Sequence, residues 1–179
     1  IAPSLVGSEM CIRDSAWGAN NNYCFTTTAL TSKIWLIYED ENGEWQGKAV
    51  ADIGDPAKVP LPVDISITSD DQGLWVNTFM DGNARYFDIS DPFNPVQKYG
   101  EEIGGQVNMI SQSWDGKRAY FSTSLLGNWD KDSNGEMQWV KLYEWDDEKL
   151  ELSHKWTVDF YKEKLGRAHQ MRFGAYSLY

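Results

Sequence analysis

Two histidines are the side chains of this sequence best suited to metal binding or proton transfer near neutral pH. His169 lies in "LGRAHQMRFG" (165–174), after the strand-like "WTVDF" (156–160) and a turn. A lone histidine is more often a packed, hydrogen-bonded residue than a metal ligand, so the residue pattern leaves both interpretations open. His154, in "ELSHKW", has no motif around it and is predicted to be a structural or surface residue.

A second candidate is the acidic stretch "DKDSNGE" (130–136), in which Asp130, Asp132 and Asn134 alternate. Alternating oxygen ligands followed by glycine resemble the first half of an EF-hand calcium loop. The twelfth position of such a loop needs a bidentate glutamate, and here it is Lys141, with no flanking helices expected. The sequence therefore favours an acidic hairpin tip over a calcium site.

The overall charge limits the partners of the chain. Sixteen basic residues against twenty-seven acidic ones give a net charge of −11 over 179 residues. An acidic surface repels phosphates, so nucleic acid is not an expected partner. No apolar run approaches the roughly 20 residues of a membrane helix, so no membrane insertion is expected. Two cysteines make no disulfide framework, and a soluble protein of the cytoplasm or of the periplasm both remain open.

The elements that must position these residues are predicted to be β-strands. Short runs rich in aromatic and β-branched residues alternate with Asn-Gly, Asp-Gly and Pro turn signals. The predicted strands are 23–28, 33–38, 63–68, 73–79, 84–89, 118–124 and 138–145. No window sustains an amphipathic helix over three turns, so the chain is predicted to be all-β.

The strands also repeat along the chain. "VDISITSDDQGLWV" (63–76) parallels "VNMISQSWDGKRAYF" (107–121) at a spacing of 44, with one residue inserted before the last aromatic. A partial copy at 34–54 matches 84–104 at a spacing of 50. Four-stranded repeats of this length are typical of β-propeller blades and are favoured over a β-sandwich. About two and a half blades are expected, fewer than the roughly four to eight of a closed propeller, which indicates a fragment with exposed strand edges.

Residues 1–15 read differently from the rest. "IAPSLVGSEMCIRDS" has no sustained period, begins without Met and lacks the layout of a signal peptide. It resembles translated sequencing-adapter read-through and is predicted to be a non-native segment, with a native N-terminal arm as the alternative. Residues 16–179 are then the C-terminal part of a β-propeller domain.

Several blocks of the sequence resemble the selenium-binding protein family, whose members include methanethiol oxidases. They are "PVDISITSDDQGLWVNTFMDGNARYFDISDPFNP" (62–95), "GGQVNMISQSWDGKRAYFSTSLLGNWDK" (104–131), "VDFYKEKLGRAHQMRF" (158–173) and "FTTTALTSKIWLIYEDENGEW" (25–45). The resemblance spans about residues 20–173, in the family's order.

The resemblance implies a β-propeller that oxidises methanethiol with oxygen and copper to formaldehyde, hydrogen sulfide and hydrogen peroxide. His169 matches the histidine of the family's "AHExRY" block and is the copper ligand that the resemblance implies. Its partner histidines would lie mostly upstream, so the fragment alone is expected to be inactive. Asp81 stands where the family's "LHGD" block has histidine, and "RFGAYSLY" replaces a glycine-rich end. The alternative is a non-catalytic propeller that binds a protein partner or a selenium or sulfur species.

Overall fold

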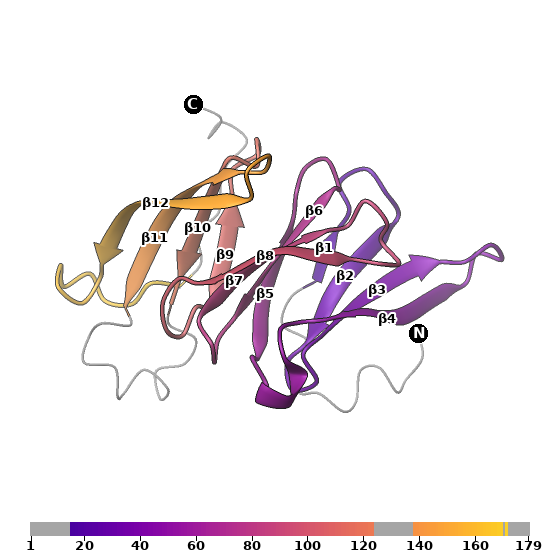
Figure 1. Cartoon of the computed structure of the whole chain (residues 1–179), viewed down its shortest axis with the longest axis horizontal. Helices are drawn as coiled ribbons and strands as arrows, with labels where there is room; N and C mark the ends of the chain where they lie inside the picture. Colours follow the sequence, from indigo (N-terminus) through magenta and orange to yellow (C-terminus); the bar gives the residue numbers. More distant parts are fainter. Residues whose placement is uncertain (1–14, 124–137, 170, 172–179) are drawn as a thin grey trace.

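The computed structural model describes residues 15–123, 138–169 and 171, and nearly all regular structure in them is β-strand (Figure 1). The first sheet contains β1 (Ser15–Trp17), β2 (Tyr23–Thr28), β3 (Lys33–Glu39) and β4 (Trp45–Asp52). The second contains β5 (Pro62–Ile67), β6 (Gly73–Thr78), β7 (Asn83–Asp88) and β8 (Val96–Glu102). The third contains β9 (Met109–Gln112), β10 (Arg118–Ser122), β11 (Trp139–Asp146) and β12 (Glu151–Asp159). A short 3-10 helix, η2 (Pro56–Lys58), precedes β5, and no helix in these ranges is long and apolar enough to cross a membrane.

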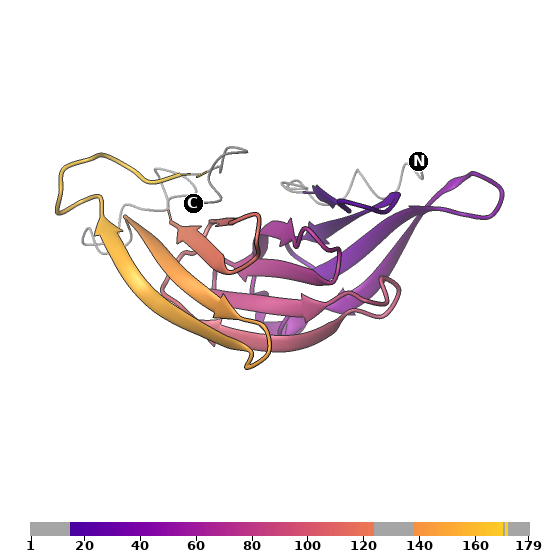
Figure 2. The same cartoon turned by 90° about the horizontal axis from the view of Figure 1, so that it is seen from above.

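The three sheets are consecutive antiparallel meanders arranged side by side along an arc. Figure 2 shows β1 and the segment that leads to residue 171 on the concave side, with β12 on the convex side. In each sheet the chain therefore runs from an inner strand to an outer one and then returns to the inner strand of the next sheet. The predicted all-β propeller architecture is confirmed, with three four-stranded sheets in place of about two and a half blades.

The pairing of the strands corrects the repeat that the sequence suggested. Ser66 pairs with Trp75 in the second sheet, and Ser111 pairs with Tyr120 in the third. Equivalent residues are thus 45 apart (111−66 and 120−75), and the predicted spacing of 44 with an inserted residue is wrong. The cause is the hairpin "ITSDDQG", where the hydroxyl and carboxylate that close the turn belong to Thr68 and Asp70, not to the Ser and Asp one residue later.

The same side chains close the equivalent turn of the third sheet. Ser113 Oγ bonds the carboxylate of Asp115, whose Oδ1 accepts from the Lys117 amide at 3.1 Å, and the Arg118 amide donates to Ser113 Oγ at 3.0 Å. Short polar side chains satisfy amides that a tight turn leaves unpaired. In the first sheet Thr28 pairs with Lys33. In the second sheet Asn77 pairs with Ala84, so Thr78 and Asn83 are the next residues along the two strands. Thr78 and Asn83 are thus the equivalents of Thr28 and Lys33, and the spacing of 50 between the first two sheets is confirmed.

Two apolar clusters fill the spaces between neighbouring sheets. The cluster between the first and second sheets includes Phe25, Leu36 and Phe87, all 1% exposed or less. The cluster between the second and third is built around Trp75, fully buried, whose ring centroid lies 4.8 Å from that of Trp145 in an edge-to-face arrangement. Aromatic residues at these positions join the sheets because burial of such large apolar surfaces dominates packing energy.

Candidate functional site

At one end of the propeller, a threonine at or just after the end of the second strand of each sheet bonds the backbone where the third strand begins. Thr28 Oγ1 accepts from the Lys33 amide at 3.3 Å, and Thr123 Oγ1 accepts from the Trp139 amide at 3.0 Å. Thr78, the equivalent in the second sheet, donates to the Asn83 carbonyl at 3.4 Å. These three bonds define the end of the molecule at which the remaining site residues lie.

His169 lies at this end, on a segment that follows β12 and returns to the third sheet. The hydroxyl of Ser122, in β10, donates to the backbone carbonyl of His169, and the hydroxyl of Ser111, in β9, donates to that of Met171. Ala168 is 2% exposed, whereas His169 is exposed. The segment is therefore fixed by its backbone, and the imidazole is left accessible.

The position of this segment is that of an inner strand. In the second sheet Ser66, the equivalent of Ser111, accepts from Gln112 Nε2 at 2.7 Å, and Gln112 belongs to the inner strand of the next sheet. Ser111 also contacts the segment beside it, but its hydroxyl donates to the backbone carbonyl of Met171. Residues 168, 169 and 171 thus lie beside the third sheet where the inner strand of a following sheet would begin.

The other histidine has a different environment. His154 lies exposed in β12, its ring centroid 5.3 Å from that of Tyr143 and its Nε2 2.9 Å from the Thr157 hydroxyl. No acidic or sulfur ligand contacts it among the interactions of the described residues. The predicted structural or surface role of His154 agrees with this placement.

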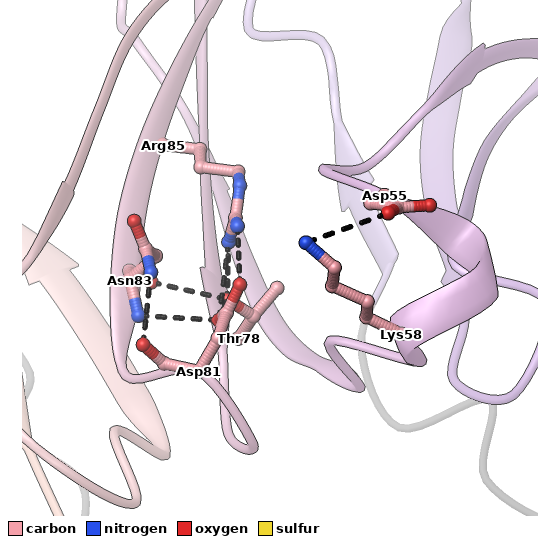
Figure 3. A network of polar contacts seen from close by, with 6 residues as sticks. All are labelled: Asp55, Lys58, Thr78, Asp81, Asn83 and Arg85. Atoms are coloured by element: carbon pink, nitrogen blue, oxygen red, sulfur yellow. Dashed lines mark hydrogen bonds and ion pairs between the residues drawn. The ribbon is translucent and has the colours of Figure 1, made fainter.

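Asp81 is held in a polar network in the turn between β6 and β7 (Figure 3). Its carboxylate pairs with the guanidinium of Arg85 and accepts from the hydroxyl of Thr78, while Asn83 donates to its backbone carbonyl at 2.8 Å. Burial raises the pKa of Asp81, but the hydrogen bonds and charge of Arg85, together with Thr78, outweigh burial and hold it below its usual value. A carboxylate engaged in this way is a poor replacement for a free imidazole ligand.

Arg85 also contacts the corner that ends the first sheet. Gly54 has a φ of +62°, and a Cβ placed on it would lie 2.9 Å from Arg85 Nη2. Lys141 holds the equivalent position in the third sheet, since Val76 pairs with Arg85 and Phe121 pairs with Lys141.

Lys141 contacts the corner that ends the second sheet. Its Nζ donates to the carbonyl of Ile103 and lies 4.1 Å from the ring centroid of Trp139. A Cβ placed on Gly104, whose φ is +140°, would lie 3.0 Å from this Nζ. The two sheet interfaces therefore use the same device, which we call the glycine corner: Arg85 at Gly54, and Lys141 at Gly104.

The described residues do not by themselves form a metal site. They contain no group of three or more His, Cys, Asp or Glu side chains close enough to hold an ion. His169, the copper ligand that the resemblance implies, lies among the described residues without such a group around it. Asp130, Asp132 and Asn134, the calcium candidates, lie outside the described residues.

Sequence reasoning missed the residues that fix the candidate ligand and the sheets. Ser111 and Ser122 gave no motif, because a serine in a strand is common and its partner, residues 168–171, is distant in sequence. The glycine corners had a signal: "IG" recurs at 53–54 and 103–104, at the spacing of 50 that the sequence already showed.

Comparison with solved structures agrees with the class of fold. A hypothetical selenium-binding protein from Sulfolobus tokodaii superimposes with a TM-score of 0.66 and 27% identity, covering 78% of this chain and 38% of that one. The β-propeller domain of Myceliophteria thermophila Cps50 (Swd1) gives a TM-score of 0.59 at 11% identity, over 78% of this chain and 42% of that one, and supports the fold alone. The molecule is thus part of a β-propeller.

The family follows from sequence comparison. The model of the 56kDa selenium binding protein (SBP56) family matches residues 12–176, and the chain belongs to this family. It is 64% identical over 163 residues to a protein of Ruegeria pomeroyi named methanethiol oxidase, which covers 91% of this chain and 37% of the relative. A methanethiol oxidase of Hyphomicrobium is 57% identical over 155 residues, covering 87% and 35%. The chain spans little more than a third of the length of these relatives.

Proposed function

We propose that this chain is part of an enzyme that oxidises a small thiol such as methanethiol with oxygen, with copper as cofactor. The observation that carries the proposal is the identity of 64% to the Ruegeria protein named methanethiol oxidase. An exposed histidine fixed beside the inner strand of the third sheet adds a ligand of the appropriate kind. Because the chain matches little more than a third of that relative, the activity is proposed for the longer protein.

The overall reaction balances without a further reductant. Methanethiol, oxygen and water give formaldehyde, hydrogen sulfide and hydrogen peroxide, so the methyl carbon is oxidised by two electrons and oxygen is reduced by two. The C–S bond breaks, sulfur leaves as sulfide, and the carbonyl oxygen comes from water. Copper, when bound, would supply the redox chemistry.

The contribution of this chain is to hold one imidazole and to shape one end of the propeller. His169 would bind the metal through a ring nitrogen, since its backbone carbonyl is already engaged by Ser122. The remaining ligands would come from the rest of the longer protein, because the described residues contain no cluster that completes the site. The Asp81 turn would contribute no imidazole, and its carboxylate stays paired with Arg85.

The test uses the longer protein, purified with copper and supplied with methanethiol. We expect methanethiol-dependent oxygen consumption, with sulfide and peroxide formed in equal amounts, and a large loss of both copper and turnover in His169→Ala. The matched control is His154→Ala, which removes an exposed histidine of β12 and leaves both unchanged. Copper content that is unaltered by His169→Ala would remove this residue from the site.

A second candidate is a non-catalytic propeller that binds a selenium or sulfur species or a protein partner. The observation in its favour is Asp81, whose carboxylate is engaged by Arg85 and Thr78 where the family's "LHGD" block has histidine. The copper content and methanethiol-dependent oxygen consumption of the longer protein distinguish the two candidate functions. A protein that is metal-free and inactive with methanethiol would support the binding role.

A further inference from the structure

We propose that Ser122 and Ser111 are positioning residues for His169, which they hold through the backbone carbonyls of His169 itself and of Met171 so that the imidazole projects in one place. This inference rests on the proposed copper role of His169 and adds the residues through which the third sheet would control it. Both hydroxyls bond backbone carbonyls, so each serine acts through the chain that carries the ring.

The two hydroxyls bind the chain at the ligand and just after it. Ser122 donates to the carbonyl of His169 itself, and Ser111 donates to the carbonyl of Met171, two residues further along. Because Ser111 lies in β9 and Ser122 in β10, the two carbonyls are tied to two neighbouring strands of one sheet. Two attachments to one sheet restrict where the backbone at His169 can lie.

Burial supports the same conclusion. Ser122 is 2% exposed and Ala168 is 2% exposed, so this part of the segment lies against the sheet, whereas His169 is exposed. A buried hydroxyl without a partner is costly, and the carbonyl of His169 satisfies that of Ser122. The backbone is thus held on the side facing the sheet, and the ring is available on the other.

The equivalent residue of the second sheet does not make this contact. Ser122 corresponds to Asn77 in the second sheet, at the spacing of 45, and Asn77 is fully buried with no hydrogen-bond partner for its side chain among the described residues. The second sheet therefore does not make this bond to the next inner strand, although it keeps the Ser66 contact. The serine hydroxyl at position 122 is the difference that joins His169 to the sheet.

A fixed backbone matters for a metal ligand because a mobile one loses conformational freedom when the metal binds. That loss opposes binding, and a ligand that is already held avoids part of it. Removal of one hydroxyl should therefore weaken copper binding through His169 without removing any donor atom from the metal.

The experiment uses the longer protein with Cu(II) added below one equivalent, because the described residues of this chain do not complete a metal site. Amide hydrogen exchange at His169 and Met171 is measured by NMR, and copper bound to imidazole is measured by the nitrogen hyperfine structure of its EPR signal. In Ser122→Ala we expect exchange at both amides to accelerate several-fold and copper affinity to fall about fivefold, as loss of one hydrogen bond predicts. Ser111→Ala should have the same effects, and Ser122→Thr, which keeps the hydroxyl, should restore both.

The matched control is Ser153→Ala in β12, where the hydroxyl bonds Glu151 at 3.1 Å and is distant from residues 168–171 in the sheet order. It should change neither measurement. Unchanged exchange in Ser122→Ala would overturn the inference, as would faster exchange with copper affinity that falls in His169→Ala but not in Ser122→Ala. If His169→Ala leaves copper binding unchanged, the copper role fails, while faster exchange in the serine variants would still show that the serines hold the segment.

Discussion

The two glycine corners occupy equivalent positions, and at each a long cationic side chain packs against the glycine that ends the preceding sheet. The groups around the two cations differ in charge. At the first, Arg85 is paired with Asp81 and reaches the Gly54 corner. At the second, Lys141 contacts a backbone carbonyl and the face of the Trp139 ring, and no ion pair involves it among the described residues. A long cationic side chain that extends to the glycine is common to both corners, whereas the group that interacts with its charge differs.

The largest effect on stability is expected when the carboxylate that pairs with Arg85 is removed. Asp81→Ala should leave the guanidinium of Arg85, whose side chain is 7% exposed, without its carboxylate and should lower the free energy of unfolding by about 3 kcal/mol. Lys58→Ala is the matched control, because it leaves the Asp55 cap of η2 in place and removes a pair that spans 3.7 Å between exposed side chains (Figure 3), which should be worth less than about 1 kcal/mol. Urea unfolding followed by tryptophan fluorescence gives both values. Equal losses would show that burial of Arg85 does not set the difference.

The second test adds a Cβ atom at each glycine of the two corners. A Cβ at Gly104 would lie 2.9 Å from the buried Trp139 ring and would adopt a φ of +140°, so Gly104→Ala should cost about 2 kcal/mol or more. At Gly54 the Cβ would meet the end of the Arg85 side chain, and its φ of +62° is the left-handed region, which costs a non-glycine residue about 1 kcal/mol. In thermal unfolding, the midpoint temperature of Gly104→Ala should be lower than that of Gly54→Ala. The reverse ranking would mean that Trp139 moves more readily than Arg85.

The third test exchanges each cation for an apolar side chain of similar length. Arg85→Met leaves Asp81 without its partner, so we expect a loss of about 1–2 kcal/mol, smaller than that of Asp81→Ala because the carboxylate is a third exposed. Lys141→Met leaves no paired acid behind and keeps a side chain over Trp139, so the loss should stay below about 1 kcal/mol. Denaturant midpoints measure both. A Lys141→Met variant that is destabilised as much as Arg85→Met would contradict the distinction between the corners.

The smallest effects are expected from pH. The pKa of Asp81 is lowered in the folded protein, so its contribution to stability is complete above the unfolded value of about 3.9 and is lost as pH falls through the folded value. Burial lowers the pKa of Lys141, so at that corner stability should instead increase as pH rises through the lowered pKa toward about 10.4.

These two pH effects are separated by variants. Between pH 5 and pH 3 the wild type should lose more unfolding free energy than Asp81→Asn, and the gain on the alkaline side should be absent in Lys141→Met. Unfolding in urea at each pH measures the difference. Acid sensitivity that is the same with and without the Asp81 carboxylate would assign it to other acidic groups.

Local sequence pattern was enough to predict the two central strands of each sheet. β2 was predicted with its observed bounds, Tyr23–Thr28, because aromatic and β-branched residues are bracketed there by turn signals. Outer strands were harder: β8 (Val96–Glu102) and β4 (Trp45–Asp52) are largely exposed and carry Gly, Lys and Glu, which have weak strand preference. These strands form because a neighbouring strand offers its hydrogen bonds, which no local pattern records.

The candidate site was predictable only in part, for a similar reason. His169 was found through its resemblance to the family block, and the turn of Asp81 through its departure from another. The serines that hold the segment depend on which residues, distant in sequence, face each other in the folded sheet. The pairing of Asp81 with Arg85 is local, four residues apart, and depends on the conformation of the turn. A shift of one residue, such as the one made in the hairpin before Trp75, moves every side chain to the opposite face.

The threonine bonds described at one end of the sheets have a consequence for strand register. Thr28 accepts from the amide of Lys33, and Thr123 accepts from the amide of Trp139 at the start of the third strand. Each bond joins the end of the second strand directly to the start of the third. The pairing of these strands is therefore anchored at this end by the strands' own ends.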